Sequence, residues 1–199
     1  MSLDAVGLLE LKGVAAGYAS LDIMVKHSPV QILEANLVEP GKFLILYAGG
    51  VAEVEEAHTR VLEEREEQVI SELLLPFAHE SILEGLRNTE HIQKIDHYDC
   101  IAVVETKTIA GTLLGVDRAL KDACVSLVGL RVAIALGGKG FFVLEGAQHD
   151  IVAALDTVSI MVSEMGGLFH QEVIARPHPE AVEWMLRKAP FQVRSREWN

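Results

Sequence analysis

The chain has 199 residues, half of them hydrophobic, and a formal net charge of −12. This length suffices for one large domain or two small ones, and the negative charge argues against nucleic acid as the main partner, because phosphates attract basic surfaces. No apolar stretch reaches the roughly 18 residues of a membrane span, and the start, MSLDAV, lacks the pattern of a signal peptide, so we expect a cytoplasmic protein.

The first half of the chain predicts the element order β-α-β-β-α-β, which is the ferredoxin-like order of the α+β class. Pro29 is expected to end the first helix, and Pro40-Gly41 is a strong turn pattern between two strands. The predicted segments are strand 4–12, helix 13–27, strands 30–38 and 42–48, helix 51–66, strand 68–75 and a short helix 79–87.

Each of the two longer helices should bury one apolar face. The predicted face of helix 13–27 holds Val14, Tyr18, Leu21 and Val25. The predicted face of helix 51–66 holds Val51, Val54, Ala57, Val61 and Leu62. The glutamates of the run AEVEEAHTRVLEEREEQ fall on the other face, where we expect a solvated surface and not a metal site.

The second half repeats this pattern after a polar linker at 88–98, and the last nine residues are predicted to be a loosely held tail. We therefore expect one domain at 4–90 and a second at 98–188. The predicted segments of the second half are strands 99–107, 125–135, 140–146 and 167–175 and helices 109–122, 148–165 and 179–188.

The two halves also match residue by residue when 7–38 is placed on 102–133. Gly41-Lys42 then corresponds to Gly138-Lys139 after a small shift, and PFAH at 76–79 corresponds to ARPH at 175–178. The remaining matched pairs are Glu10 with Glu105, Lys12 with Lys107, Asp22 with Asp117, Lys26 with Lys121 and Gly49 with Gly146.

Neither Gly-Lys pair is a phosphate-binding loop. Such a loop needs a Gly five residues earlier and a Ser or Thr after the Lys, and the first copy has Asn36 and Phe43 at these positions. The second copy has Ala133 and Gly140 there. Both pairs are interpreted as turns followed by the start of a strand.

Both halves carry a series of short motifs in a fixed order. The first half has GLLELKG, SLDIMVK and the Gly turn, and the second has VVETKT, VDRALK, GGKGFF and IARPH. This ordered series resembles the bacterial microcompartment shell domain. Two such domains in tandem resemble the trimeric, pseudohexameric shell proteins. The unpermuted type is indicated, because each half begins with the ETK-type strand and ends with the PH-type segment. The resemblance covers nearly the whole chain.

The resemblance implies a flat tile in which three chains of two domains make a ring of six. It implies a non-enzymatic protein of a microcompartment shell whose partners are itself, other shell proteins at the tile edges and small metabolites in a central pore, with no nucleic acid and no membrane. The residues that it places around the pore are Glu39, Pro40 and Gly41 from the first turn and Leu136, Gly137 and Gly138 from the second. Those that it places at the tile edge are Lys26, Lys121 and Arg176.

Two departures from the family pattern lead to further expectations. The first half has PFAH where the second has ARPH, so it lacks the Arg and its edge contacts should differ. Some tandem members carry a Cys in the first turn that holds an iron–sulfur cluster. Glu39 stands there in this chain, and neither Cys100 nor Cys124 falls in a turn, so we expect no such cluster and no other cofactor.

Several alternatives stay open at this stage. Glu39 is either part of an acidic constriction, conceivably with a bound divalent ion, or a solvated turn carboxylate. Lys26 and Lys121 form either tile contacts or ordinary pairs with Asp22 and Asp117. A trimeric ferredoxin-like regulator that binds small molecules is the alternative function.

The sequence offers little for catalysis or metal binding. Glu10 and Glu105 could suggest paired acids, but equivalent positions of two repeats lie apart, so a structural role with backbone or Lys partners is expected. His91, His97 and Cys100 cluster near the linker without a fourth zinc ligand and are interpreted as surface polar residues.

Overall fold

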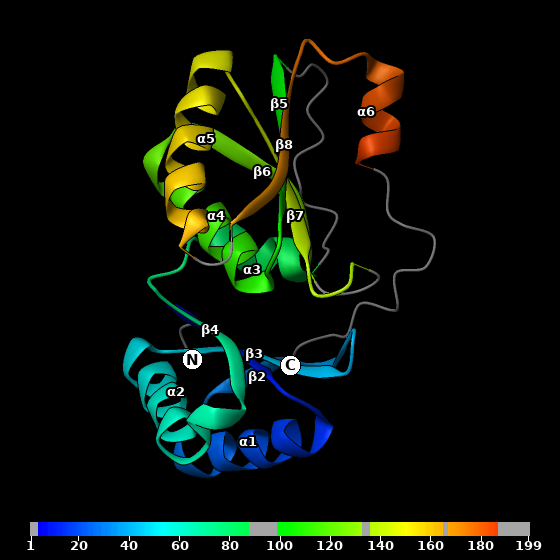
Figure 1. The fold of residues 1–199 in the computed structure, drawn as a ribbon. Coiled ribbons are helices and arrows are strands. Elements are labelled where there is room, and N and C mark those ends of the chain that lie inside the picture. Colours follow the sequence, from blue (N-terminus) through cyan, green and yellow to red (C-terminus); the bar gives the residue numbers. More distant parts are fainter. Residues whose placement is uncertain (1–3, 88–98, 133–135, 165–166, 187–199) are drawn as a thin grey trace. The chain divides into compact units, whose positions relative to one another are not determined.

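The structure, a computed structural model, describes residues 4–87, 99–132, 136–164 and 167–186. The chain divides into two compact units, residues 1–78 and residues 79–199. Each unit contains a four-stranded sheet with helices packed on it (Figure 1). The units are described one at a time below.

Unit 1 is an antiparallel sheet with the strand order β2-β3-β1-β4. This order is the ferredoxin-like one, with β1 and β3 in the centre and β2 and β4 at the edges. Its elements are β1 (Ala5–Leu11), α1 (Val14–His27), β2 (Gln31–Val38), β3 (Lys42–Gly49), α2 (Val51–Arg65), the 3-10 turn η1 (Glu66–Gln68) and β4 (Val69–Pro76).

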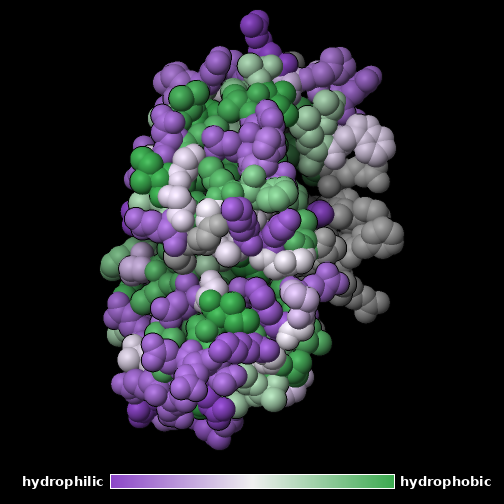
Figure 2. All heavy atoms as spheres, viewed as in Figure 1, coloured by the Kyte–Doolittle hydropathy of each residue, from purple (hydrophilic) through white to green (hydrophobic). Residues whose placement is uncertain are grey.

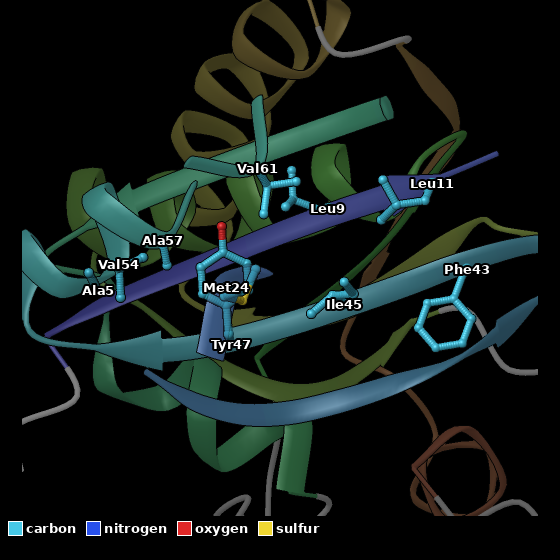
Figure 3. Packing of buried hydrophobic residues seen from close by; sticks show 10 residues of the cluster. All are labelled: Ala5, Leu9, Leu11, Met24, Phe43, Ile45, Tyr47, Val54, Ala57 and Val61. Atoms are coloured by element: carbon cyan, nitrogen blue, oxygen red, sulfur yellow. The ribbon is translucent and has the colours of Figure 1, made fainter. Parts of the chain in front are cut away.

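The core of unit 1 lies between the sheet and its two helices (Figure 3). Period-2 alternation directs every second side chain of β1 and β3 toward the helices, and helical spacing directs the apolar face of α2 toward the sheet. The fully or almost fully buried members are Ala5, Leu9, Leu11, Met24, Phe43, Ile45, Tyr47, Val54, Ala57 and Val61. The predicted apolar face of α2 is thus confirmed.

The predicted face of α1 is confirmed for Val14 and Leu21, which pack against the core, and wrong for Tyr18 and Val25. Tyr18 and Val25 are exposed, and the residues that α1 buries are Gly17, Ser20 and Met24. The reason is close packing, because a Cβ at residue 17 would lie 2.2 Å from Cδ1 of Phe43. The small residues therefore face the sheet, and the Tyr18 ring packs edge-on against Phe43 from outside.

Unit 2 repeats the arrangement with the strand order β6-β7-β5-β8. Its sheet carries irregularities in register at Glu105/Thr106 and Leu127/Gly129, which correspond to those at Glu10/Leu11 and Ile32/Glu34 in unit 1. The elements are α3 (Glu80–Arg87), β5 (Cys100–Thr106), α4 (Ile109–Asp122), β6 (Val125–Val132), β7 (Gly140–Gly146), α5 (Gln148–Ser163), β8 (Leu168–Ala175) and α6 (Pro179–Met185).

Two short helices complete unit 2. Helix α3 follows the first repeat in sequence, yet it packs against β6, with Gly85 close enough to Leu127 and Leu130 that a Cβ would lie 3.1 Å from each. In α6, Val182 packs with Ile101 and with residues of β6 and β7. Helix α3 therefore belongs to unit 2 by its contacts.

The predicted α+β class, element order and duplication are confirmed, and helix α1 ends at His27, two residues before Pro29, as expected. The predicted linker 88–98 and the tail at 191–199 lie outside the described residues, as do the last residues of the predicted segments that end at 135, 165 and 188. Among the described helices none is long and apolar enough to cross a bilayer.

Candidate functional site

The first predicted pore turn joins β2 to β3 in unit 1. Glu39, Pro40 and Gly41 are all exposed, and the register Val38↔Lys42 shows that the turn closes the hairpin directly. Gly41 has φ +88°, and a Cβ there would meet nothing within 4 Å. Gly is therefore required by backbone conformation and not by crowding within this chain.

The second predicted pore turn precedes β7 in unit 2. Gly137 and Gly138 have φ +62° and +79°, and the Lys139 N–H donates to the Leu136 carbonyl at 3.2 Å. The ammonium of Lys139 lies 4.0 Å from the centroid of the Phe169 ring, a cation–π contact. Both Gly-Lys pairs are thus turns, as the sequence indicates.

The lysine after the first turn anchors the start of β3. Lys42 Nζ lies 3.6 Å from Oε2 of Glu10, whose side chain is 1% exposed. Burial raises the pKa of Glu10, and the neighbouring Lys42 opposes this increase. The expected Lys partner of Glu10 is therefore present in unit 1, while Glu105 is only partly buried in unit 2.

The two predicted edge lysines have different surroundings. Lys26 pairs with Asp22 on α1, and both side chains are exposed. Lys121 pairs with Asp117 on α4 at 2.7 Å, but the Asp117 side chain is only 3% exposed. The second Asp117 oxygen also accepts the backbone N–H of His79 at 2.9 Å.

This second bond was missed at the level of sequence. The i,i+4 spacing predicts the pair of Asp117 with Lys121, but nothing in the spacing indicates that the residue before α3 returns to α4. Asp117 therefore holds the N-terminus of α3, and Lys121 balances its charge.

Arg176 and Phe77 occupy equivalent places after the last strand of each repeat. Both have positive φ, +47° and +53°, although neither is a glycine. Both are exposed, Phe77 to 70%. The same backbone conformation thus presents a guanidinium in unit 2 and a phenyl ring in unit 1.

The outward faces of α2 and α5 also differ in chemistry. Glu55, Glu56, Glu63 and Glu64 of α2 are exposed, which confirms the predicted solvated acidic face. In α5 the exposed residues include Val152 and Ile160. Figure 2 shows hydrophilic side chains over α1 and α2 and hydrophobic ones interrupting the surface over α5.

The described part of the chain contains no group of three His, Cys, Asp or Glu side chains suited to a metal ion. His91 and His97 of the predicted surface cluster lie outside the described residues. Cys100 is buried in β5, where burial raises its thiol pKa, so its reactive thiolate form is disfavoured.

Comparison with known proteins places this duplicated fold in a family. The family model described as the BMC domain matches residues 5–77 and again residues 100–177. The chain belongs to the BMC-domain family. It is similar to the bacterial microcompartment shell protein PduT of Citrobacter freundii, with 32% identity over 175 residues that cover 88% of this chain and 94% of that protein.

Solved structures of BMC-domain proteins have the same architecture. A microcompartment protein from Desulfitobacterium hafniense DCB matches with a TM-score of 0.79 and 28% identity, over 92% of this chain and 99% of that one. A fused permuted hexameric shell protein of the RMM microcompartment matches at 0.59 and 19% identity, over 81% and 85%, a likeness in fold alone. This BMC-domain chain is a structural protein of a bacterial microcompartment shell.

Proposed function

We propose that three copies of this chain form a flat pseudohexameric tile with a central pore that passes metabolites selectively. The pairing of two BMC domains in one chain carries the proposal, because three chains then supply six equivalent modules. In support, the two glycine turns occupy equivalent positions, and Gly41 of the first and Gly137 of the second are exposed. The tile would select solutes by size and charge and would not perform catalysis.

The state of association tests this proposal. Light scattering or native mass spectrometry of the purified chain is expected to give the mass of three copies. Electron microscopy is expected to show hexagonally packed layers. A single-copy mass, or discrete particles that bind metabolites and never form layers, would instead favour the small-molecule regulator.

Glu39 is proposed to set the charge preference of the pore. Three carboxylates around one axis would attract cations and slow anions. The proposal includes no iron–sulfur cluster, because such clusters are held by Cys thiolates and Glu39 occupies the first turn. An iron and sulfide determination on anaerobically purified protein checks this point.

We expect Glu39→Gln to reduce the cation preference of the pore several-fold, because the variant removes charge and keeps the side chain's size. Conductance of tiles reconstituted in a planar bilayer, measured in asymmetric salt, gives the ratio of cation to anion permeability. Glu56→Gln on the exposed face of α2 is the matched control and should leave the ratio unchanged. An equal ratio for Glu39→Gln and the unchanged chain would remove Glu39 from the pore.

Lys26 is proposed to contact the neighbouring tile. We expect Lys26→Asp to abolish layers in electron microscopy and to preserve the three-copy mass, since its exposed pair with Asp22 is worth only about 0.2–0.5 kcal/mol to the fold. Arg60→Asp, which breaks another exposed helical pair, is the control. Layers that persist with Lys26→Asp would exclude this contact. Lys121 is less suitable for the test because its pair with Asp117 is part of the fold.

A further inference from the structure

A chain of three polar side chains crosses the interior of unit 1. The Tyr47 hydroxyl on β3 lies 2.5 Å from Nδ1 of His58 on α2, and Nε2 of His58 lies 3.2 Å from a carboxylate oxygen of Glu72 on β4. Tyr47 and His58 are buried, whereas Glu72 is about half exposed on the edge strand. Hydrogen bonds therefore connect the core to the edge strand through the helix.

The space for this chain comes from Gly7 on β1. Gly7 lies directly across from Tyr47 in the sheet, and a Cβ at Gly7 would lie 2.3 Å from Cζ of Tyr47. In Figure 3 the Tyr47 ring lies over the central part of the sheet with its hydroxyl directed toward the helix that carries Ala57 and Val61. The missing side chain at Gly7 lets the ring pass over β1.

One protonation state satisfies all three groups. With neutral His58 protonated on Nε2, the Tyr47 O–H donates to Nδ1 and Nε2–H donates to the Glu72 carboxylate. A second proton on His58 turns Nδ1 into a donor. The Tyr47 hydroxyl then loses its acceptor inside the core, which is unfavourable for a buried polar group.

Unit 2 has the same packing without this chain. Ala102 lies across from Leu144 as Gly7 lies across from Tyr47, and Gln171 lies across from Val104 as Glu72 lies across from Leu9. Leu155 occupies in α5 the buried position that His58 has in α2. The fold therefore does not require polar groups at these positions.

We propose that Tyr47, His58 and Glu72 form a proton-sensitive latch, which holds the edge strand β4 to α2 when His58 is neutral and loosens it when His58 is protonated. The response is confined to unit 1, because unit 2 has apolar residues in place of Tyr47 and His58. A shallow surface hollow of about 260 Å³ borders Glu72, so the carboxylate end of the latch is in contact with solvent. This inference concerns one domain and is independent of the proposed tile.

The charges around His58 decide the direction of the response. Burial lowers the pKa of His58, and this effect outweighs Glu72, which raises it. Burial also raises the pKa of Tyr47, so the phenol stays neutral. The other nearby acidic groups are Glu55, one turn earlier on α2, and Glu66 of η1 at the same hollow. The side chains that α1 and β1 bury against this core, Ser20, Met24, Leu9 and Leu11, carry no charge.

The sign of the pH dependence follows from this shift. A histidine whose pKa is lower in the folded state binds more protons when unfolded. The stability that it contributes is fully present above its unfolded pKa of about 6.5 and is lost as the pH falls below that value. Acidification should therefore open β4, by up to about tenfold in the opening equilibrium per pH unit for one proton.

Hydrogen exchange of the intact protein between pH 7.5 and 5 tests the latch, with intrinsic exchange rates corrected at each pH. We expect the amides of β4 to lose protection as the pH falls and those of β8, the equivalent strand of unit 2, to remain unchanged. Equal changes in the two strands, or no change in β4, would overturn the proposal.

A variant that copies unit 2 into unit 1 provides the control: Gly7→Ala, Tyr47→Leu, His58→Leu and Glu72→Gln together. It should fold and lose the pH response of β4, and a response that persists in it would contradict the latch. Glu72→Gln alone keeps an acceptor for His58 but removes the charge that raises its pKa. The opening of β4 should therefore increase further at the acidic end of the range, and a smaller opening than in the unchanged chain would also overturn the proposal even if the fourfold variant fails to fold.

Discussion

Gly7→Ala is expected to destabilise unit 1 by about 2–4 kcal/mol. The new methyl group would lie 2.3 Å from Cζ and 2.4 Å from Cε2 of Tyr47, distances that a packed core does not tolerate. Overpacking of this kind costs about 1–3 kcal/mol. Displacement of the ring would also break the buried hydrogen bond to His58, at about 1 kcal/mol or more.

The measurement is chemical unfolding of the full chain followed by circular dichroism, with hydrogen exchange to assign the loss to residues 4–78. The pair Gly7→Ala with Tyr47→Leu reproduces Ala102 and Leu144 of unit 2, which lie across from each other without conflict. The two changes should therefore be less harmful together than the sum of their separate effects. Strict additivity would show that the Tyr47 ring does not need the space at Gly7.

Asp117→Ala is expected to destabilise unit 2 by about 2–4 kcal/mol. The buried carboxylate accepts the His79 N–H and balances Lys121, so its removal leaves a backbone donor and a partly buried ammonium without partners. Lys121 retains some contact with water, which keeps the expected loss at the lower end for a buried pair. Helix α3 should lose protection from exchange first.

Asp22→Ala is the matched control for this change. Asp22 holds the same position in unit 1 and makes the same i,i+4 pair, but both members of the pair, Asp22 and Lys26, are exposed. Its removal should cost less than about 0.5 kcal/mol. Similar losses for the two variants would mean that burial of Asp117 and its bond to His79 contribute little.

The sequence predicted the elements well because each has a local pattern. These patterns, such as apolar runs, the Pro40-Gly41 turn and Pro29, each span only a few residues of sequence. The repeat supports the assignments, because the same element order occurs twice. Tyr18 and Val25 of α1 were mispredicted because α1 approaches the sheet closely at Gly17, which hydrophobicity does not report. The 3-10 turn η1 (Glu66–Gln68) was not predicted, because the predicted helix 51–66 and strand 68–75 left no separate element there.

The latch is not visible in the residues that the two halves share. The latch appears instead as differences between the halves at aligned positions. Tyr47 and His58 of the first half are aligned with Leu144 and Leu155 of the second. The bond of Asp117 to His79 joins residues far apart in sequence and depends on the path of α3, so no local pattern predicts it.

The exposed glutamates of α2 and the exposed Val152 and Ile160 of α5 show what fusion of two modules into one polypeptide permits. In a ring of identical single-domain subunits, any substitution occurs in every subunit. A hydrophobic surface is then present on all six modules or on none. Two domains in one chain are free of this constraint, because one domain can acquire exposed hydrophobic side chains while the other keeps charged ones. Divergence after duplication thus gives this polypeptide two chemically distinct exteriors on one shared scaffold.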